Sequence, residues 1–456
     1  MPAPTLSPPV PPPEPQPPAR AATAPNSGDG SYLAHRAVQL LGAGAMAFGA
    51  TLWLPPAEAG FYFMLLSLLG AQALLDAGSS TVLLSFVARA MRHLHWAAPD
   101  RLAGSAAAVA RLGDLTRLAL TWAVASSALA LALVLPLALL LLRLRPEGVQ
   151  IDPGGQITVC TIAALALYQL GAALPQVLEG TGRVSDVARM RALLDVLAYT
   201  AAVACLLAGN GLWAPAVLWS LRGAGQLLWS LAWTRRLLGR SRPRWLRRRL
   251  ACTMAPMQGR LALSWTVGFL GLQTMVPISY ALLGPALTGR IGLGLFLANG
   301  VLMLATAPVS SRAPELGRLG AQRAWRLFDD LAAQALRRSL GLALAGHTLT
   351  LLGVAAAGAL FAEVAERLPE PSWLAWLALS SLASTAIQAI ATALRACGRE
   401  PFLAATLWGA ALLPPALLIG AGGWGAPGLC LAHLLLNGGL GLPWALRLRR
   451  RFRETR

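Results

Sequence analysis

The sequence predicts an all-α polytopic membrane protein with twelve transmembrane helices in two six-helix lobes. Three observations predict this architecture: charged residues are sparse, apolar runs of membrane-spanning length recur, and turn motifs repeat between the two halves. Only 12% of the residues are charged, 56% are hydrophobic, and the mean hydropathy is +0.58. Because a soluble protein carries about a quarter of its residues as charges, this composition indicates a bilayer environment.

The first segment, residues 1–31, is predicted to be a disordered tail. Eleven prolines lie within residues 1–30, and such a chain favours polyproline II and cannot bury a core. A ligand for a proline-recognising domain is the alternative interpretation. The segment lacks the charged start and apolar stretch of a secretory leader, so we expect no cleavage there.

Twelve apolar spans follow, each suited to crossing about 30 Å of hydrocarbon as a helix. They cover residues 33–54, 60–90, 115–142, 157–178, 191–209, 212–234, 260–283, 290–311, 339–362, 373–395, 402–421 and 424–446. We therefore expect an N-terminal lobe over 32–235 and a C-terminal lobe over 260–446. A basic linker over 236–259 joins them, and a basic tail over 447–456 follows.

The arginines predict the orientation. All 38 basic residues are arginines; four lie in predicted outer loops, one (Arg222) lies inside a span, and 33 lie on the opposite side. Because cytoplasmic loops collect positive charge, we expect both termini in the cytoplasm. The absence of lysine, with abundant Ala, Gly and Pro, indicates GC-rich bacterial coding, so the expected location is a bacterial inner membrane.

The most basic run, from Arg235 to Arg260, contains nine arginines and has two interpretations. It fits a nucleic-acid patch in a soluble chain or a cytoplasmic loop in a membrane protein. The surrounding spans favour the loop, which would contact anionic lipid headgroups. We therefore expect the bilayer as a partner and no nucleic acid.

Two motif pairs indicate an internal repeat. The pattern L-x-P-A-x-x-G occurs at 54–60 and at 283–289, a separation of 229. The pattern L-x-x-x-G-R occurs at 178–183 and at 394–399, a separation of 216. Both pairs fall at equivalent places in the two sets of six spans. An even number of spans gives the halves the same orientation, related by an axis along the membrane normal.

Two such bundles, with a cavity between them that opens alternately to each side, are typical of a transporter. The outer loops are too small for a catalytic domain, and no nucleophile–base, H-E-x-x-H or phosphate-loop motif occurs, which disfavours an enzyme. The five scattered cysteines lack metal or disulfide spacing. We expect no metal, no catalytic residues and no cofactor.

The stretch 54–90 resembles a known family. Its Pro/Glu turn, Gly-aromatic-Tyr and small-residue break are Pro56, Glu58, Gly60, Phe61, Tyr62 and 76–80. These resemble the first hairpin of Wzx-type flippases, the O-antigen and capsule repeat-unit transporters of the multidrug/oligosaccharidyl-lipid/polysaccharide (MOP) superfamily. Residues 284–319 resemble the family's eighth helix, although Arg290-Ile291 replaces the usual Gly-aromatic-Tyr pair.

The resemblance covers about residues 33–446 and implies a V-shaped cavity between two lobes, as in the related multidrug (MATE) exporters. It implies that the cargo is an undecaprenyl-diphosphate-linked oligosaccharide moved from the inner to the outer leaflet. It also implies other membrane proteins of polysaccharide and lipopolysaccharide assembly as partners.

Arg222 is the first candidate for binding the cargo. A buried charge in a membrane is costly and often functional, and the guanidinium fork fits a phosphate. The alternative is a structural ion pair with Asp76 or Asp195. Asp76 and Asp195 are themselves candidates for proton or sodium coupling, because a carboxylate in a low dielectric can cycle between charged and neutral forms. A fixed salt bridge is the alternative role for both.

Further candidates lie nearer the inner side or among neutral polar residues. His35, Arg36 and Arg89 are expected to form an inner vestibule, with positive-inside anchoring as the alternative for the two arginines. Gln39 and Asn299 belong to a set of amides that fit a sugar path, with interhelical hydrogen bonding as the alternative.

Two other functions stay open from the sequence. A MATE-like multidrug or organic-cation antiporter has the same architecture, although its cavity would favour acidic residues over Arg222. A membrane-embedded glycan polymerase or acyltransferase would need larger outer loops or a deep histidine, for which His347 is the candidate.

Overall fold

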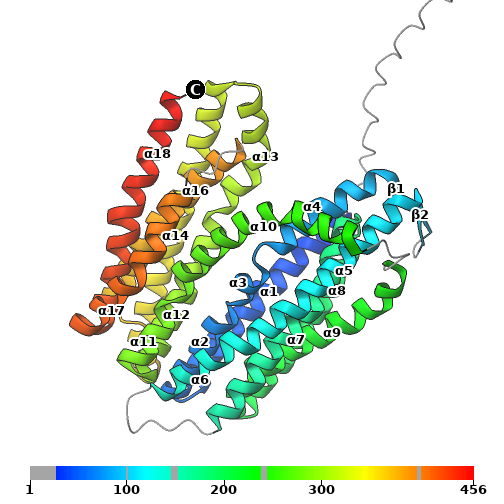
Figure 1. Ribbon diagram of the computed structural model, residues 1–456. Coiled ribbons are helices and arrows are strands. Elements are labelled where there is room, and N and C mark those ends of the chain that lie inside the picture. Colours follow the sequence, from blue (N-terminus) through cyan, green and yellow to red (C-terminus); the bar gives the residue numbers. More distant parts are fainter. Residues whose placement is uncertain (1–26, 99–100, 145–152, 238–243, 398–401, 456) are drawn as a thin grey trace, which may run out of the picture.

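The computed structural model describes residues 27–98, 101–144, 153–237, 244–397 and 402–455. Helices form almost all of this structure and are arranged as two lobes that diverge in a V (Figure 1). Among the described residues, eight helical stretches are long and apolar enough to cross a membrane. The expected helical polytopic fold is confirmed, whereas the count of twelve spans and the side that each terminus faces stay predictions.

The N-terminal lobe contains the first nine α-helices. Its elements are α1 Ser27–Trp53, α2 Pro56–Leu69, α3 Gln72–Asp76, α4 Ser79–Ala90, η1 Met91–His93, β1 Leu94–Ala98, β2 Arg101–Gly104, α5 Ala106–Leu129, η2 Ala130–Val134, α6 Leu135–Arg143, α7 Gly154–Gly180, α8 Val184–Leu207, η3 Gly211–Trp213 and α9 Ala214–Leu237. The predicted tail falls mainly on residues outside the described ranges, and α1 begins at Ser27.

The rest of the chain forms the C-terminal lobe. Its elements are α10 Arg244–Gln273, α11 Met275–Leu283, α12 Pro285–Ala305, α13 Ala307–Ala321, α14 Trp325–Leu360, α15 Ala362–Ala365, α16 Pro371–Ala396, α17 Leu403–Leu434, η4 Leu435–Gly441 and α18 Leu442–Glu454. Within α17 the chain reverses at Gly425, whose φ of 64° requires the left-handed region. The two halves of α17 then pack so closely that a Cβ on Gly428 would lie 2.1 Å from the Gly420 carbonyl oxygen.

Helix α10 begins inside the segment predicted as a linker. It starts at Arg244 and runs to Gln273, which joins the predicted linker to the seventh span as one helix. It contacts α3, α4 and α5 of the N-terminal lobe and α17 of the C-terminal lobe (Figure 1). The boundary between the lobes is therefore bridged by a helix.

The lobes meet along α2 and α12, near the closed end of the V (Figure 1). Glycines make this approach possible. A Cβ on Gly60 would lie 1.7 Å from the Pro285 carbonyl oxygen, and one on Gly292 would lie 2.4 Å from the Phe63 ring. Helix α4, the β-hairpin, α13 and the end of α18 lie at the opposite, open end (Figure 1).

The expected all-α class holds for nearly all of the described residues, and one loop adds a short β-hairpin that was not predicted from the sequence. Strands β1 and β2 form an antiparallel hairpin that pairs Leu94 with Gly104 and Trp96 with Leu102. Leu94 is buried while its neighbour His95 is exposed, the alternation of a half-covered strand. The Trp96 indole donates to the Thr181 carbonyl oxygen at 3.1 Å, so a contact from the α7–α8 turn holds the hairpin.

Candidate functional site

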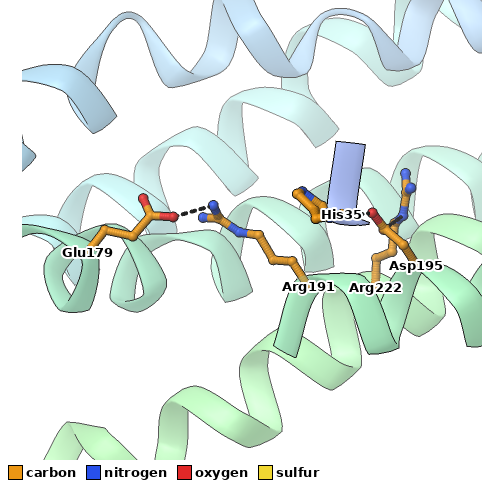
Figure 2. A network of polar contacts seen from close by, with 5 residues as sticks. All are labelled: His35, Glu179, Arg191, Asp195 and Arg222. Atoms are coloured by element: carbon orange, nitrogen blue, oxygen red, sulfur yellow. Dashed lines mark hydrogen bonds and ion pairs between the residues drawn. The ribbon is translucent and has the colours of Figure 1, made fainter. Parts of the chain in front are cut away.

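Three helices of the N-terminal lobe bring a charged cluster together. Arg222 of α9 lies with its Nε 2.6 Å from Asp195 Oδ1 on α8, and His35 of α1 places Nδ1 3.1 Å from Asp195 Oδ2 (Figure 2). The three side chains are only 11%, 6% and 10% exposed for Arg222, Asp195 and His35. One buried carboxylate is thus shared between two basic groups.

Close packing of α1 on α8 builds this cluster. A Cβ on Gly42 would lie 2.3 Å from the Tyr199 ring, so only glycine lets α1 approach α8 at that level. The Tyr199 ring in turn lies 4.6 Å from the Arg222 guanidinium carbon, in cation–π geometry. Arg222 is therefore held by a carboxylate at its Nε and by an aromatic ring over its face.

The cluster lies deep in the helices that carry it. Arg222 is eight residues from the start of α9 and Asp195 eleven from the start of α8, which at 1.5 Å per residue is about 12 Å and about 16 Å. Within the described residues, Asp195 is the only carboxylate within 4 Å of Arg222. Of the two predicted ion-pair partners, the structure shows Asp195 and not Asp76.

Sequence reasoning did not pair Asp195 with His35, and it missed a second ion pair beside the cluster. Arg191, one helical turn before Asp195 on α8, pairs with Glu179 of α7 (Figure 2). The sequence spacing does not indicate Glu179, which lies on another helix, but Arg191 and Asp195 are four residues apart and lie on one face of α8. That face therefore carries two successive charged contacts.

Asp76 has a different role from the predicted salt bridge. Its carboxylate accepts hydrogen bonds from Ser79 Oγ at 2.9 Å, Ser80 Oγ at 2.7 Å and Ser80 N at 3.3 Å, and so caps the start of α4. Ala77 and Gly78 take left-handed conformations, with φ of 48° and 70°, in the break before that helix. Within the described parts of the chain, Asp76 makes no ion pair.

Asp76 also faces a cavity of about 320 Å³ under α10. Gln169 and Gln176 of α7 and Gln258 of α10 are polar residues of its wall, and Asp76 is the only charged side chain among the described lining residues. Its predicted part in ion coupling stays a prediction, now placed in a neutral, amide-rich pocket.

The predicted inner vestibule is only partly described. The side chain of Arg36 lies outside the described residues, and Gln39 is half-buried one turn beyond His35 on α1. Arg89 is exposed at the end of α4, with its guanidinium 4.8 Å from the Phe86 ring. Arg318, at its repeat-equivalent position, is exposed on α13. Their roles in binding or anchoring stay predictions.

Asn299 lies apart from the charged cluster, in the C-terminal lobe. It lines a cavity of about 390 Å³ between α12, α16, α17 and η4, together with Gln388 and Asn437. Behind the wall, Ser380 Oγ lies 2.8 Å from His433 Nδ1 and accepts from Asn437 Nδ2 at 3.0 Å. Sequence reasoning missed Ser380 and His433, which are 53 residues apart and carry no motif.

Comparison with solved structures shows which fold this is. The chain is similar to an inward-facing MATE-family multidrug transporter of the MOP superfamily, with a TM-score of 0.66, 14% identity and coverage of 93% of this chain and 99% of that one. It is also similar to the lipid II flippase MurJ in an inward closed conformation, with a TM-score of 0.62, 10% identity and coverage of 93% and 87%.

A third structure is a MOP-superfamily transporter from Pyrococcus furiosus, described as having a binding pocket of reverse polarity. Its TM-score is 0.51 at 14% identity, with coverage of 92% of this chain and 93% of that one. No protein-family model and no curated protein matches the sequence. The fold is therefore that of MOP-superfamily transporters, over nearly the whole chain.

Proposed function

We propose that this chain flips a polyprenyl-diphosphate-linked oligosaccharide from the inner to the outer leaflet of a bacterial cytoplasmic membrane, for surface polysaccharide assembly. The fold is that of transporters that include a lipid flippase, which supports a transporter rather than a glycan polymerase or acyltransferase. An anionic cargo is supported by the buried positive charge of Arg222.

The observation that carries the proposal is the buried guanidinium of Arg222. A lipid diphosphate brings about two negative charges into a low dielectric, where a compensating cation is worth far more than in water. In the structure Asp195 and Tyr199 contact Arg222. A phosphate can replace Asp195 as the anion beside Arg222, because the guanidinium fork binds carboxylates and phosphates alike.

His35 gives Asp195 a second partner. When phosphate takes Arg222, Asp195 keeps its contact with His35 Nδ1. The exchange therefore leaves the carboxylate with a partner. This second contact supports Asp195 as the candidate for the predicted coupling role.

Arginines at the open end of the V support an anionic cargo. Arg89 on α4 and Arg318 on α13 contribute exposed charge from the two lobes, and Arg248 and Arg249 add charge on α10. Such a basic rim raises the local concentration of an anionic headgroup. Other membrane proteins of polysaccharide assembly are the partners that such a cargo would require.

A MATE-like organic-cation antiporter is the second candidate, favoured by the pocket around Asp76. Its wall carries one carboxylate and, among the described lining residues, no base. One assay distinguishes the two functions, because the flippase carries an anionic lipid and the antiporter carries an organic cation.

The test uses the purified full chain in proteoliposomes. A fluorescent disaccharide linked by diphosphate to a short polyprenol is loaded, and its appearance in the outer leaflet is followed with a membrane-impermeant quencher. We expect Arg222→Gln to slow flipping about 10- to 100-fold, the loss of a charge-assisted contact, and Arg222→Lys to retain part of the rate. Arg143→Gln, at an exposed arginine at the end of α6, is the matched control. Flux of a lipophilic organic cation with no flipping would instead support the antiporter.

A further inference from the structure

The cavity of the C-terminal lobe is built from parts that the charged cluster does not use. It has a volume of about 390 Å³ and lies between α12, α16, α17, η4 and the start of α18. That volume is in the range of pockets for small organic ligands. Of the described lining residues none is acidic, and the only arginine is Arg395, at the end of α16. We call this cavity the C-lobe groove.

Two amides of the groove, Asn299 and Gln388, are exposed, and neither side chain makes a hydrogen bond within the described residues. They lie six and eight residues from the ends of α12 and α16, which at 1.5 Å per residue is about 9 Å and about 12 Å. An amide inside a membrane-spanning helix costs free energy in hydrocarbon unless water or a ligand hydrogen-bonds to it.

The third amide is held in place. Asn437 donates to Ser380 Oγ at 3.0 Å, and Ser380, which is fully buried, lies 2.8 Å from His433 Nδ1. Asn437 retains its carbonyl oxygen for a donor in the groove, because its amide nitrogen makes these contacts. The network fixes the orientation of Asn437 before any ligand is bound.

The backbone beside Asn437 departs from the α-helix. Residues Leu435–Gly441 form a π-helix, and Leu436, Asn437, Leu440 and Gly441 of this segment line the groove. A π-helical turn is rare and frequently lies at a functional site. The helix that forms this part of the groove wall therefore departs from α-helical geometry at Asn437.

These features fit a neutral ligand with many hydroxyl groups. Amides both donate and accept hydrogen bonds, so they match hydroxyls, which do the same. Trp444 and Phe402 add aromatic rings to the wall, and the C–H faces of a pyranose ring pack on aromatic surfaces. The described lining holds one arginine and no carboxylate, which favours a neutral ligand over a strongly charged one.

We propose that the C-lobe groove binds the saccharide of the cargo, through the amides of Asn299, Gln388 and Asn437. This inference rests on the proposed function and divides its site in two: the diphosphate binds at Arg222 in the N-terminal lobe, and the sugar binds in the other lobe. The binding free energy of a cargo that contacts both lobes favours one arrangement of the lobes over the other. The groove is also where discrimination between sugars takes place.

The test compares two probes on the full chain in nanodiscs. One probe is farnesyl diphosphate, and the other is farnesyl diphosphate carrying a disaccharide, prepared with hexose, N-acetylhexosamine or deoxyhexose ends. We expect wild type to bind at least one saccharide probe more tightly than the bare diphosphate. Gln388→Ala and Asn299→Ala should each reduce that advantage about 5- to 10-fold, the loss of one hydrogen bond, and leave the affinity for bare farnesyl diphosphate unchanged.

Both variants remove exposed side chains that make no hydrogen bond within the described residues, so they should fold normally. Gln322→Ala, at an exposed glutamine after α13, is the matched control. It should keep the full difference in affinity between the saccharide probe and bare farnesyl diphosphate. Arg222→Gln should weaken both probes equally. If wild type binds every probe with the same affinity, or if the two groove variants retain the sugar advantage, the groove proposal is wrong even where flipping is intact. If no diphosphate probe binds or moves, the proposed function itself fails.

Discussion

Gly60 of α2 and Gly289 of α12 pack directly against each other across the boundary between the lobes. A Cβ on Gly289 would lie 3.2 Å from Gly60 N, and the two residues occupy equivalent positions of the sequence repeat, 229 residues apart. Equivalent residues come into contact where a pseudo-twofold axis passes between them. The repeat thus marks the seam about which the two lobes are arranged.

Replacing Gly60 with alanine should disturb this seam. A Cβ there would lie 1.7 Å from a backbone oxygen, that of Pro285, which cannot rotate away as a side chain could. We expect a loss of about 1–3 kcal/mol, typical of overpacking, measured as a lower Tm in detergent. Gly300→Ala, on the partner helix α12 and with no atom within 4 Å of the added Cβ, should leave the Tm unchanged. Equal effects of the two substitutions would show that close packing at the seam is not the cause.

A second contact across the lobes lies at the same end. Arg367, between α15 and α16, donates from Nη1 to the carbonyl oxygens of Leu54 at 2.8 Å, Leu52 at 2.9 Å and Thr51 at 3.3 Å. These carbonyl groups lie at or just after the C-terminal end of α1, where they accept no hydrogen bond from within the helix. Arg367 therefore ties the C-terminal lobe to the end of α1 while the V is open at the other end.

Arg367→Gln should make this closed end open more often. Ala59, 4% exposed and close to Gly289, is a suitable reporter once changed to cysteine in a background without other cysteines. We expect a membrane-impermeant maleimide to label Ala59→Cys about tenfold faster when Arg367 is replaced, the effect of roughly 1.4 kcal/mol of lost hydrogen bonding. Arg143→Gln serves as the control. Unchanged labelling would mean that the Arg367 contacts do not hold the lobes together.

The sequence predicted positions along each helix better than positions around it. The place of Arg222 along its helix and the meeting of the repeat motifs follow from counting residues along spans. Which side of α8 faces α1, and hence that His35 reaches Asp195, depends on helix rotation, which Gly42 against Tyr199 decides through packing. Apolar residues surround these spans on all sides, so hydrophobic periodicity does not report rotation.

Loop contacts were the other failure. The L-x-x-x-G-R motif that ends at Arg183 predicts a turn but not which other segments the turn contacts. Arg183 lies 4.1 Å from the Trp96 ring and 4.7 Å from the Trp233 ring, and pairs with Asp186 at 2.9 Å. Trp96 comes from the β-hairpin, which is held through the hydrogen bond from Trp96 to Thr181. A single sequence does not show such contacts between distant segments.

The ion pair of Arg222 and Asp195 should show strong thermodynamic coupling. Asp195→Asn alone leaves a buried guanidinium without its carboxylate, which costs about 3–5 kcal/mol, and should lower the Tm sharply. Adding Arg222→Gln removes that charge and should recover much of the Tm. The exposed pair Arg312–Glu315, whose side chains are 43% and 42% exposed, is the control and should couple by less than about 1 kcal/mol. Additive losses in the Asp195–Arg222 double variant would contradict an energetically coupled pair.

The orientation of the V is testable through Cys252, which is exposed on α10 near the open end. The arginine distribution predicts that this helix start lies in the cytoplasm. With the other four cysteines replaced, we expect an impermeant maleimide to label Cys252 in inside-out vesicles and not in intact spheroplasts. A variant with Arg143→Cys instead, at the end of α6, should show the opposite pattern. Labelling of Cys252 from outside alone would reverse the topology, and the V would then open away from the cytoplasm, where a cargo assembled inside has no access to it.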